Sequence, residues 1–250
     1  MIGVLDSGIG GFTVVKEIRR AFPNESIVYT GDSQNCPYGN KSKREIISLT
    51  QAMISFLEHR NVSVIVIACN TISSLIGELK SSIPLISIIS AVTREVAELN
   101  ISEVGLIATE FTVASGVYPK LLRSHQPNIR VHAQASPNLA ALIESGLLDS
   151  EQTYSEIKSL INKIRSVSTP LHVILGCTHY PLVIKAFETI APEVTFINPA
   201  TSLVTQIRQA SSQDLAPTLT IYTSGEIDTP STMLHILNIQ GFTINKISSY

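Results

Sequence analysis

Short apolar runs alternate with amphipathic stretches along the first hundred residues. The runs are rich in Val and Ile, which predicts strands buried on both faces, and the stretches between them repeat apolar residues at helical spacing. Four strands that alternate with helices indicate a parallel, doubly wound sheet. The predicted strands cover residues 1–5, 26–29, 62–68 and 85–89, and the predicted helices cover residues 12–21, 42–60, 69–80 and 91–99.

The same alternation begins again near residue 104. Strands are predicted over 104–108, 130–133 and 172–175, with helices over 113–123, from 139 to 143 and over 154–165. A final strand, helix and strand, at 218–223, 232–239 and 243–247, could extend either half. With no Pro/Ser-rich linker between the halves, we predict an α/β fold of two similar doubly wound lobes, packed tightly around a cleft.

Composition narrows the class of protein. Hydrophobic residues make up 44% of the 250 positions and charged residues 15%, against roughly 25% in an average soluble domain. A net charge of −2 and the lack of a Lys/Arg cluster give no footprint for nucleic acid or a membrane surface. The first residues, MIGVLDSGIGG, lack the basic start of a signal peptide, so we expect a soluble, cytoplasmic protein.

Two loops after predicted strands carry turn signals. Asp6 to Gly11, DSGIGG, is a glycine-rich turn before a helix, but Thr13 stands where a dinucleotide fingerprint needs its third glycine. The turn could instead hold a carboxylate or phosphate on its backbone N–H groups. After the second strand, Pro37 and Gly39 predict a turn with Tyr38 held out at its apex.

Two cysteines occupy equivalent places. Cys69 and Cys177 each follow the third strand of their half, where open α/β sheets place their chemistry. Cys36 has no such context, and we interpret it as a structural residue. Three cysteines without C-x-x-C spacing favour free thiols, and Cys177-x-His179 without a second ligand pair predicts no metal site.

Two facing thiols suit proton exchange at a carbon. A thiol–imidazole nucleophile at Cys177 and His179 is an alternative, but acyl transfer needs only one thiol. A free thiol has a pKa of roughly 8.5, so one cysteine can be thiolate while the other is thiol. Such a pair can remove a proton from one face of a stereocentre and deliver one to the other. Asp6 and His179 would move protons on and off the thiols, and the available hydrogen-bond donors are Ser7, Asn70, Thr71 and Thr178.

Four motifs identify a resemblance that covers essentially the whole chain. The chain resembles the glutamate racemases of the aspartate/glutamate racemase superfamily in Asp6-Ser7-Gly8-Ile9-Gly10-Gly11, in Gly31-Asp32 followed by Pro37-Tyr38-Gly39, in Ala68-Cys69-Asn70-Thr71, and in Leu175-Gly176-Cys177-Thr178-His179-Tyr180-Pro181. This resemblance implies cofactor-independent interconversion of L- and D-glutamate, which supplies D-glutamate for peptidoglycan and thereby serves cell wall biogenesis and cell shape.

The resemblance also assigns residues. It implies that Cys177 takes the proton from L-glutamate and Cys69 from D-glutamate, that Asp6 supports Cys69, and that His179 with Glu144 supports Cys177. It places Ser7, Tyr38, Gly39, Asn70, Thr71, Thr112 and Thr178 at the substrate. It implies one lobe of residues 1–92 and 206–250 and a second of residues 93–205. The low charge fits a homodimer.

Two other readings remain open from the residues alone. The chain could act on another small acidic substrate as a related racemase or isomerase. It could also be a two-lobed protein that closes on a small anion without turning it over.

Overall fold

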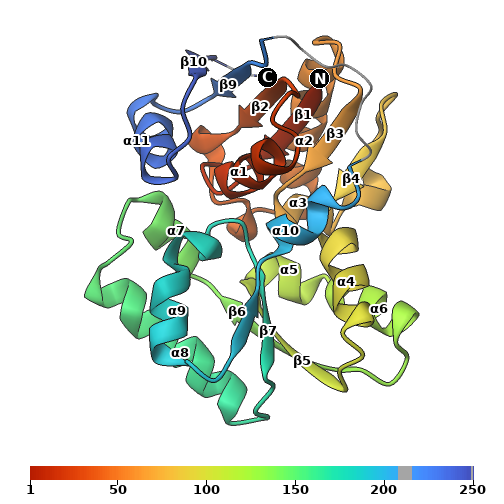
Figure 1. Ribbon diagram of the computed structural model, residues 1–250, viewed down its shortest axis with the longest axis vertical. Helices are drawn as coiled ribbons and strands as arrows, with labels where there is room; N and C mark the ends of the chain where they lie inside the picture. The colour runs from red at the N-terminus through yellow and green to blue at the C-terminus, as the bar shows by residue number, and fades with distance from the viewer. Residues whose placement is uncertain (208–215, 249) are drawn as a thin grey trace.

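The computed structural model describes residues 1–207, 216–248 and 250 and contains two parallel sheets (Figure 1). The six-stranded sheet has the order β10-β9-β2-β1-β3-β4 and the four-stranded sheet the order β6-β5-β7-β8. The strands of the first are β1 (Ile2–Asp6), β2 (Ile27–Gly31), β3 (Val64–Ile67), β4 (Leu85–Ser87), β9 (Leu219–Thr223) and β10 (Phe242–Lys246), and those of the second are β5 (Glu103–Thr109), β6 (Arg130–Ser136), β7 (His172–Gly176) and β8 (Thr195–Ile197).

The helices connect these strands in the manner of doubly wound folds. They are α1 (Phe12–Ala21), α2 (Lys43–Glu58), α3 (Asn70–Ser73), α4 (Ile88–Glu98), α5 (Glu110–Ala114), α6 (Val117–His125), α7 (Leu139–Glu144), α8 (Glu151–Arg165), α9 (Ile184–Ile190), α10 (Pro199–Val204) and α11 (Asp228–Ile236). Four short 3-10 turns are η1 (Ser33–Asn35), η2 (Tyr38–Asn40), η3 (Ile76–Glu78) and η4 (Tyr180–Val183).

The expected repeat is present in the strand order. β2-β1-β3-β4 of the first sheet corresponds to β6-β5-β7-β8 of the second, in the same chain sequence and with every pairing parallel. The helices that follow the fourth strand of each set, α4 and α10, pack against each other. The prediction of two similar doubly wound lobes is therefore confirmed, and β9 and β10 extend the first sheet beyond β2.

A continuous apolar core joins the two lobes. One cluster of buried side chains runs from Val4 and Val15 in the first lobe to Leu106 and Ile174 in the second, and includes Leu203 of α10. Two further clusters fill the other face of each sheet. Burial on both faces explains why β1 and β7 have apolar rather than alternating sequences.

Several helix boundaries differ from the sequence prediction. α1 and the Ser42–Glu45 capping box of α2 are confirmed. The helix expected over 69–80 is wrong, because α3 ends at Ser73 and only η3 follows. The helix expected over 113–123 is divided into α5 and α6 at Gly116, whose φ of +65° lies in the left-handed region. α9, β8 and α10 were not predicted.

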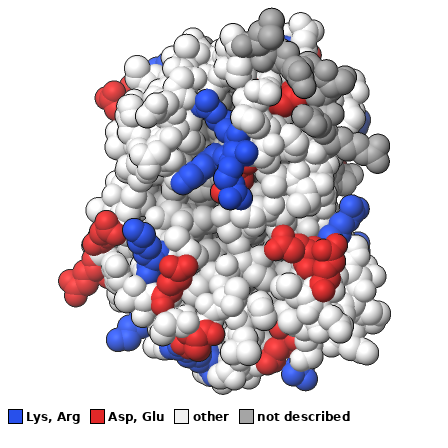
Figure 2. All heavy atoms as spheres, in the orientation of Figure 1, with Lys and Arg blue, Asp and Glu red and all other residues white. Residues whose placement is uncertain are grey.

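Charge is sparse on the visible face of the molecule. Figure 2 shows basic side chains gathered over α1, whose last turn carries Arg19 and Arg20, and scattered acidic and basic groups elsewhere. Among the described residues, no helix combines the length and the hydrophobicity needed to cross a lipid bilayer.

Candidate active site

The carboxyl ends of equivalent strands bring the two predicted thiols to one cavity. Cys69 follows β3, Cys177 follows β7, and both are buried and free of disulfides. The cavity is small, with a volume of about 10 Å³, on the scale of a single water molecule. Of the predicted site residues, those at its wall are Ser7, Tyr38, Gly39, Cys69, Asn70, Thr71, Cys177, Thr178 and His179.

Among the described residues, Cys69 has a single side-chain hydrogen-bond partner. Its Sγ lies 3.5 Å from Ser7 Oγ, and burial raises the pKa of the Cys69 thiol to about 12, with the nearby Asp6 charge acting in the same direction. A thiol in this setting is protonated at neutral pH until a base or a ligand changes its surroundings.

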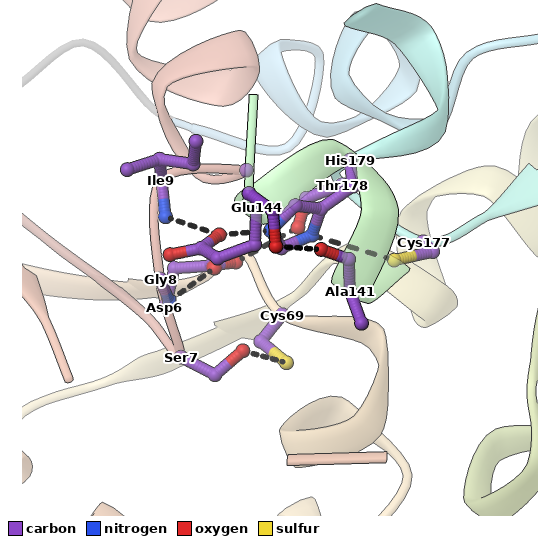
Figure 3. Close-up of polar contacts among 12 residues, drawn as sticks. Asp6, Ser7, Gly8, Ile9, Cys69, Ala141, Glu144, Cys177, Thr178 and His179 are labelled. Atoms are coloured by element: carbon purple, nitrogen blue, oxygen red, sulfur yellow. Dashed lines mark hydrogen bonds and ion pairs between the residues drawn. The ribbon is translucent and has the colours of Figure 1, made fainter. Parts of the chain in front are cut away.

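Cys177 begins a chain of hydrogen bonds, shown in Figure 3. His179 Nδ1 lies 3.6 Å from Cys177 Sγ, and His179 Nε2 lies 2.5 Å from Glu144 Oε2. Glu144 Oε2 also accepts the Ile9 N–H at 3.2 Å, which ties α7 of the second lobe to the glycine turn of the first. Burial alone would lower the pKa of His179, but hydrogen bonds to Cys177, Cys36 and Glu144 outweigh it and hold that pKa well above its ordinary value.

Asp6 lies between the two lobes. Its Oδ1 accepts the Gly8 N–H at 3.0 Å and its Oδ2 accepts the Thr178 hydroxyl at 3.1 Å. Complete burial raises the pKa of the Asp6 carboxyl to about 6, although the nearby His179 lowers it. Asp6 thus acts on Cys69 through its charge and not through a hydrogen bond, since its hydrogen bonds in the described structure are to Gly8 and Thr178.

Asn70 offers a donor to the cavity. Tyr118 donates its hydroxyl to Asn70 Oδ1 at 2.6 Å, which fixes the orientation of the amide. Asn70 Nδ2 is buried, and no partner for it is found among the described residues. An amide N–H₂ at the wall of the cavity suits a substrate carboxylate. The sequence did not predict a role for Tyr118 at the site, because only the packing of α6 against α4 brings Tyr118 near Asn70.

Three threonines form a hydroxyl cluster where the lobes meet. Thr71 Oγ1 lies 3.0 Å from Thr109 Oγ1 and 3.4 Å from Thr112 Oγ1, and Thr109 donates to Thr112 at 2.9 Å. Thr109 lines the cavity, whereas Thr112 is held one layer behind it in α5. Thr109 could have been found from its position at the end of β5. Pro37 and Ala140, which also line the cavity, carried no such signal.

Tyr38 is not at an exposed apex, so that expectation is wrong. It is 1% exposed and begins η2, and its hydroxyl donates to Asp32 Oδ2 at 2.6 Å. Ser224 donates to Asp32 Oδ1 at 2.6 Å from the far end of β9. The buried carboxylate satisfies the Tyr38 hydroxyl, and this allows the ring to line the cavity from inside. Burial, and then the charge of Asp32, raises the pKa of Tyr38 far above its ordinary value.

The glycine turn allows close approach between lobes. A Cβ on Gly10 would lie 2.5 Å from Thr178 Oγ1 and 2.6 Å from His179 Nδ1. A Cβ on Gly8 would lie 2.6 Å from Cys36 Sγ and 2.7 Å from both Glu144 carboxylate oxygens. A side chain at either position would push apart the groups that surround Cys177.

Cys36 lies closer to this chemistry than the sequence suggested. Its sulfur, a Glu144 carboxylate oxygen and a His179 ring nitrogen lie within 4.8 Å of one another. Burial raises the pKa of the Cys36 thiol to about 12, against the hydrogen bond from His179. No sequence motif linked Cys36 to residues more than a hundred positions away.

Comparison with known proteins gives a consistent result. Residues 2–207 match the model of the Asp/Glu/Hydantoin racemase family. A glutamate racemase from Oceanobacillus iheyensis is 34% identical over 239 residues, 91% of this chain and 87% of the relative. The crystal structure of a Bacillus anthracis glutamate racemase is 30% identical, with a TM-score of 0.90 over 99% of this chain and 97% of that one. One from Francisella tularensis in complex with D-glutamate is 30% identical, with a TM-score of 0.87 over 100% and 98%.

Proposed function

The chain belongs to the Asp/Glu/hydantoin racemase family, and from that premise we propose that it is a glutamate racemase that interconverts L- and D-glutamate by two-thiol proton transfer. One observation carries the mechanism. Two buried thiols, delivered by equivalent strands of two sheets, line the same cavity. The relative and the two structures described above are named glutamate racemases, which favours glutamate over other acidic substrates.

Substrate binding begins with the donors at the cavity wall. The substrate carboxylates would be held by Asn70 Nδ2, which has no partner among the described residues, and by the hydroxyls of Ser7, Thr71 and Thr178. Tyr38 and Gly39 would close the wall, and Thr112 would fix the threonine cluster. Because the cavity is far smaller than glutamate, we expect it to widen on binding and close again around the ligand.

The reaction then moves one proton at each face of the α-carbon. With L-glutamate bound, the Cys177 thiolate takes the α-proton and the Cys69 thiol gives its proton to the opposite face, which forms D-glutamate. Cys177 is left as thiol and Cys69 as thiolate, and the reverse reaction uses the same steps in the opposite order. Donors aimed at the carboxylate stabilise the negative charge that develops in between. The scheme uses only groups of this chain, so we propose that it needs no cofactor.

The thiols need partners that return them to their starting states. His179, with its raised pKa, would stabilise the Cys177 thiolate as an imidazolium, and Glu144 would orient its ring. Asp6, whose pKa of about 6 lies near operating pH, would act as the acid–base partner of Cys69. Since Asp6 is hydrogen-bonded to Thr178, this role needs a shift of its carboxyl group when substrate replaces the closed packing.

We also propose a biological setting and an assembly for the protein. The resemblance supports cytoplasmic supply of D-glutamate for peptidoglycan, and hence for cell wall biogenesis and cell shape. The low charge and the exposed Val167 and Leu171 support a homodimer. We also propose lobes of residues 1–92 with 206–250 and of residues 93–205. The first boundary falls within α4, and residues 208–215 lie outside the described part of the chain.

The deciding experiment is incubation of the purified protein with L-glutamate in deuterated water. Loss of the α-proton by NMR and loss of optical rotation should proceed together without added cofactor, and L-aspartate should react far more slowly. If neither signal changes while glutamate still protects the protein against heating, the chain is a binding protein and not a racemase.

A further inference from the structure

A sulfur, a carboxylate and an imidazole converge beside the thiol pair. Cys36 comes from the segment between η1 and η2, Glu144 from the end of α7, and His179 from the loop after β7. Each offers one ligand atom, and the three atoms lie within 4.8 Å of one another. Figure 3 shows Glu144 reaching His179 from the side of the ring opposite Cys177.

The glycine turn forms the floor of this cluster. Both Glu144 oxygens and the Cys36 sulfur lie within 2.7 Å of the position that a Gly8 Cβ would take. The absence of a side chain there allows the thiol and the carboxylate to meet. His179 Nδ1 is directed to Cys177, so Nε2 is the ring nitrogen on the Glu144 side.

Zn²⁺ prefers the donors found here, a thiolate sulfur, an imidazole nitrogen and a carboxylate oxygen. Zn²⁺ binds thiolate sulfur at about 2.3 Å, imidazole nitrogen at about 2.0–2.1 Å and carboxylate oxygen at about 2.0–2.2 Å in tetrahedral sites. Ligand atoms around such an ion lie roughly 3–4 Å apart, so small side-chain movements suffice here. Glu144 also lines an open groove of about 910 Å³ with Ser33 and Gln34, through which an ion can arrive from solvent.

We propose that Cys36, Glu144 and His179 bind Zn²⁺ with one open coordination position, and that the bound ion inhibits racemisation. On binding, the ion displaces the thiol proton to solvent and takes the lone pair of His179 Nε2. The ion then takes the place of the direct contact between His179 Nε2 and Glu144 Oε2, and so breaks the chain of hydrogen bonds that leads to Cys177. The inhibition rests on the proposed function, whereas the binding does not.

Binding is tested with Co²⁺ as a spectroscopic stand-in for Zn²⁺. The purified protein should show a thiolate-to-cobalt charge-transfer band in the near ultraviolet, at one ion per chain, which Zn²⁺ abolishes. Cys36→Ala should lose the band, whereas Cys69→Ser should keep it. A band that persists in Cys36→Ala, or no band in the unmodified protein, would overturn the site whether or not the chain racemises glutamate.

Inhibition is tested by Zn²⁺ titration of the racemase reaction. With its activity without added metal as the reference, Cys36→Ala should need at least about 10–100-fold more Zn²⁺ for the same fractional inhibition, because one of the three ligands is lost. Circular dichroism checks its folding, and Cys36→His, which restores a ligand, should recover Zn²⁺ sensitivity without the charge-transfer band. Equal sensitivity in Cys36→Ala would place the inhibitory ion on the catalytic thiols instead and refute the proposal.

Discussion

The two thiols occupy equivalent strand ends but have different surroundings. Cys177 begins a chain of hydrogen bonds through His179 and Glu144 to the Ile9 backbone, whereas Cys69 contacts the Ser7 hydroxyl. The repeat of strand order explains why the sulfurs meet in one cavity. It does not supply their proton partners, because corresponding positions carry different residues. Thr71 stands two residues after Cys69 where His179 stands two residues after Cys177, and Thr109 ends β5 where Asp6 ends β1.

Both sets of partners also cross between lobes. Asp6 of the first lobe accepts a hydrogen bond from Thr178 of the second, and Glu144 of the second accepts one from Ile9 of the first. The acid–base groups are therefore assembled only when the lobes are packed together. We conclude that the repeated strand order brings the two thiols to one cavity, while different contacts between the lobes position the acid–base groups beside each thiol.

The strongest test of this comparison removes either thiol. Cys69→Ser and Cys177→Ser should each reduce racemisation by at least about 10³-fold, within the range for loss of a general acid or base. The remaining thiol should still exchange the α-proton of one enantiomer with deuterated water, without inversion. Cys177 should do so with L-glutamate and Cys69 with D-glutamate, as NMR of each pure enantiomer would show. Exchange of both enantiomers by one variant would contradict the two-thiol mechanism.

Removing the partners should reveal the asymmetry. His179→Asn and Asp6→Asn should each lower kcat/KM by about 10²-fold. The loss must be equal in both directions, because the two enantiomers have equal free energies. The side affected appears instead in the primary isotope effect. His179→Asn should raise the effect for L-glutamate deuterated at the α-carbon and lower it for the D-enantiomer, and Asp6→Asn should do the reverse.

Identical isotope patterns in the two variants would break the assignment of one partner to each thiol. The closed packing makes this a sharp test for Asp6, since its hydrogen bonds are to Gly8 and Thr178 and not to Cys69. If Asp6→Asn instead behaves like His179→Asn, the carboxyl group acts on the Cys177 side through Thr178.

The sequence could predict the thiol positions for a physical reason. In a parallel sheet the carboxyl ends of the strands share one edge, so Asp6, Cys69 and Cys177 were found by locating strand ends. Thr109 follows the same rule, although it is not among the predicted site residues. The contacts of Asp6 with Thr178 and of Glu144 with Ile9 could not be predicted, because they depend on how one lobe lies against the other.

Local signals failed where a side chain is bonded to residues outside the local turn pattern. Pro37 and Gly39 are typical of an exposed turn, yet Asp32 accepts the Tyr38 hydroxyl and lets the ring be buried. Cys36 seemed structural because its neighbours Glu144 and His179 are remote in sequence. The strand pattern thus predicts the fold well. It cannot predict hydrogen-bond partners across the cavity, because these depend on the three-dimensional packing of the two lobes.

The buried Asp6 carboxylate should destabilise the folded protein at neutral pH, where the group must be ionised in the unfolded chain. Its pKa rises from 3.8 to about 6 on folding, so the associated stability is fully present below pH 3.8 and is lost as the pH rises through 6. Asp6→Asn removes this loss. Relative to the unmodified protein, the variant should gain up to about 3 kcal/mol in unfolding free energy between pH 4 and pH 8, measured by urea denaturation.

A carboxylate with the opposite shift provides the control. Glu58 accepts hydrogen bonds from the Ser82 N–H and nearby hydroxyls, which lower its pKa in the folded state. Glu58→Gln should therefore lose stability relative to the unmodified protein as the pH rises. If Asp6→Asn shows the same sign as Glu58→Gln, the Asp6 carboxyl is not destabilised by burial, and its proposed role as a base near neutral pH fails with it.

The smallest expected effect is that of Glu144, which acts on Cys177 only through His179. Glu144→Gln keeps the size of the side chain but removes the charge, so we expect about a tenfold loss in kcat/KM, in line with a weakened hydrogen bond to a charged group. The Glu144 hydrogen bond is one cause of the raised His179 pKa. Its loss lowers that pKa, so activity that needs protonated His179 should disappear at a lower pH.

Glu156→Gln, which alters a carboxylate bound to Ser136 in the same lobe, should leave both the activity and its pH profile unchanged. A tenfold loss without a shifted pH profile would mean that Glu144 works through its bond to Ile9, by holding the lobes together, and that the Cys177 side is no better prepared for proton transfer than the Cys69 side.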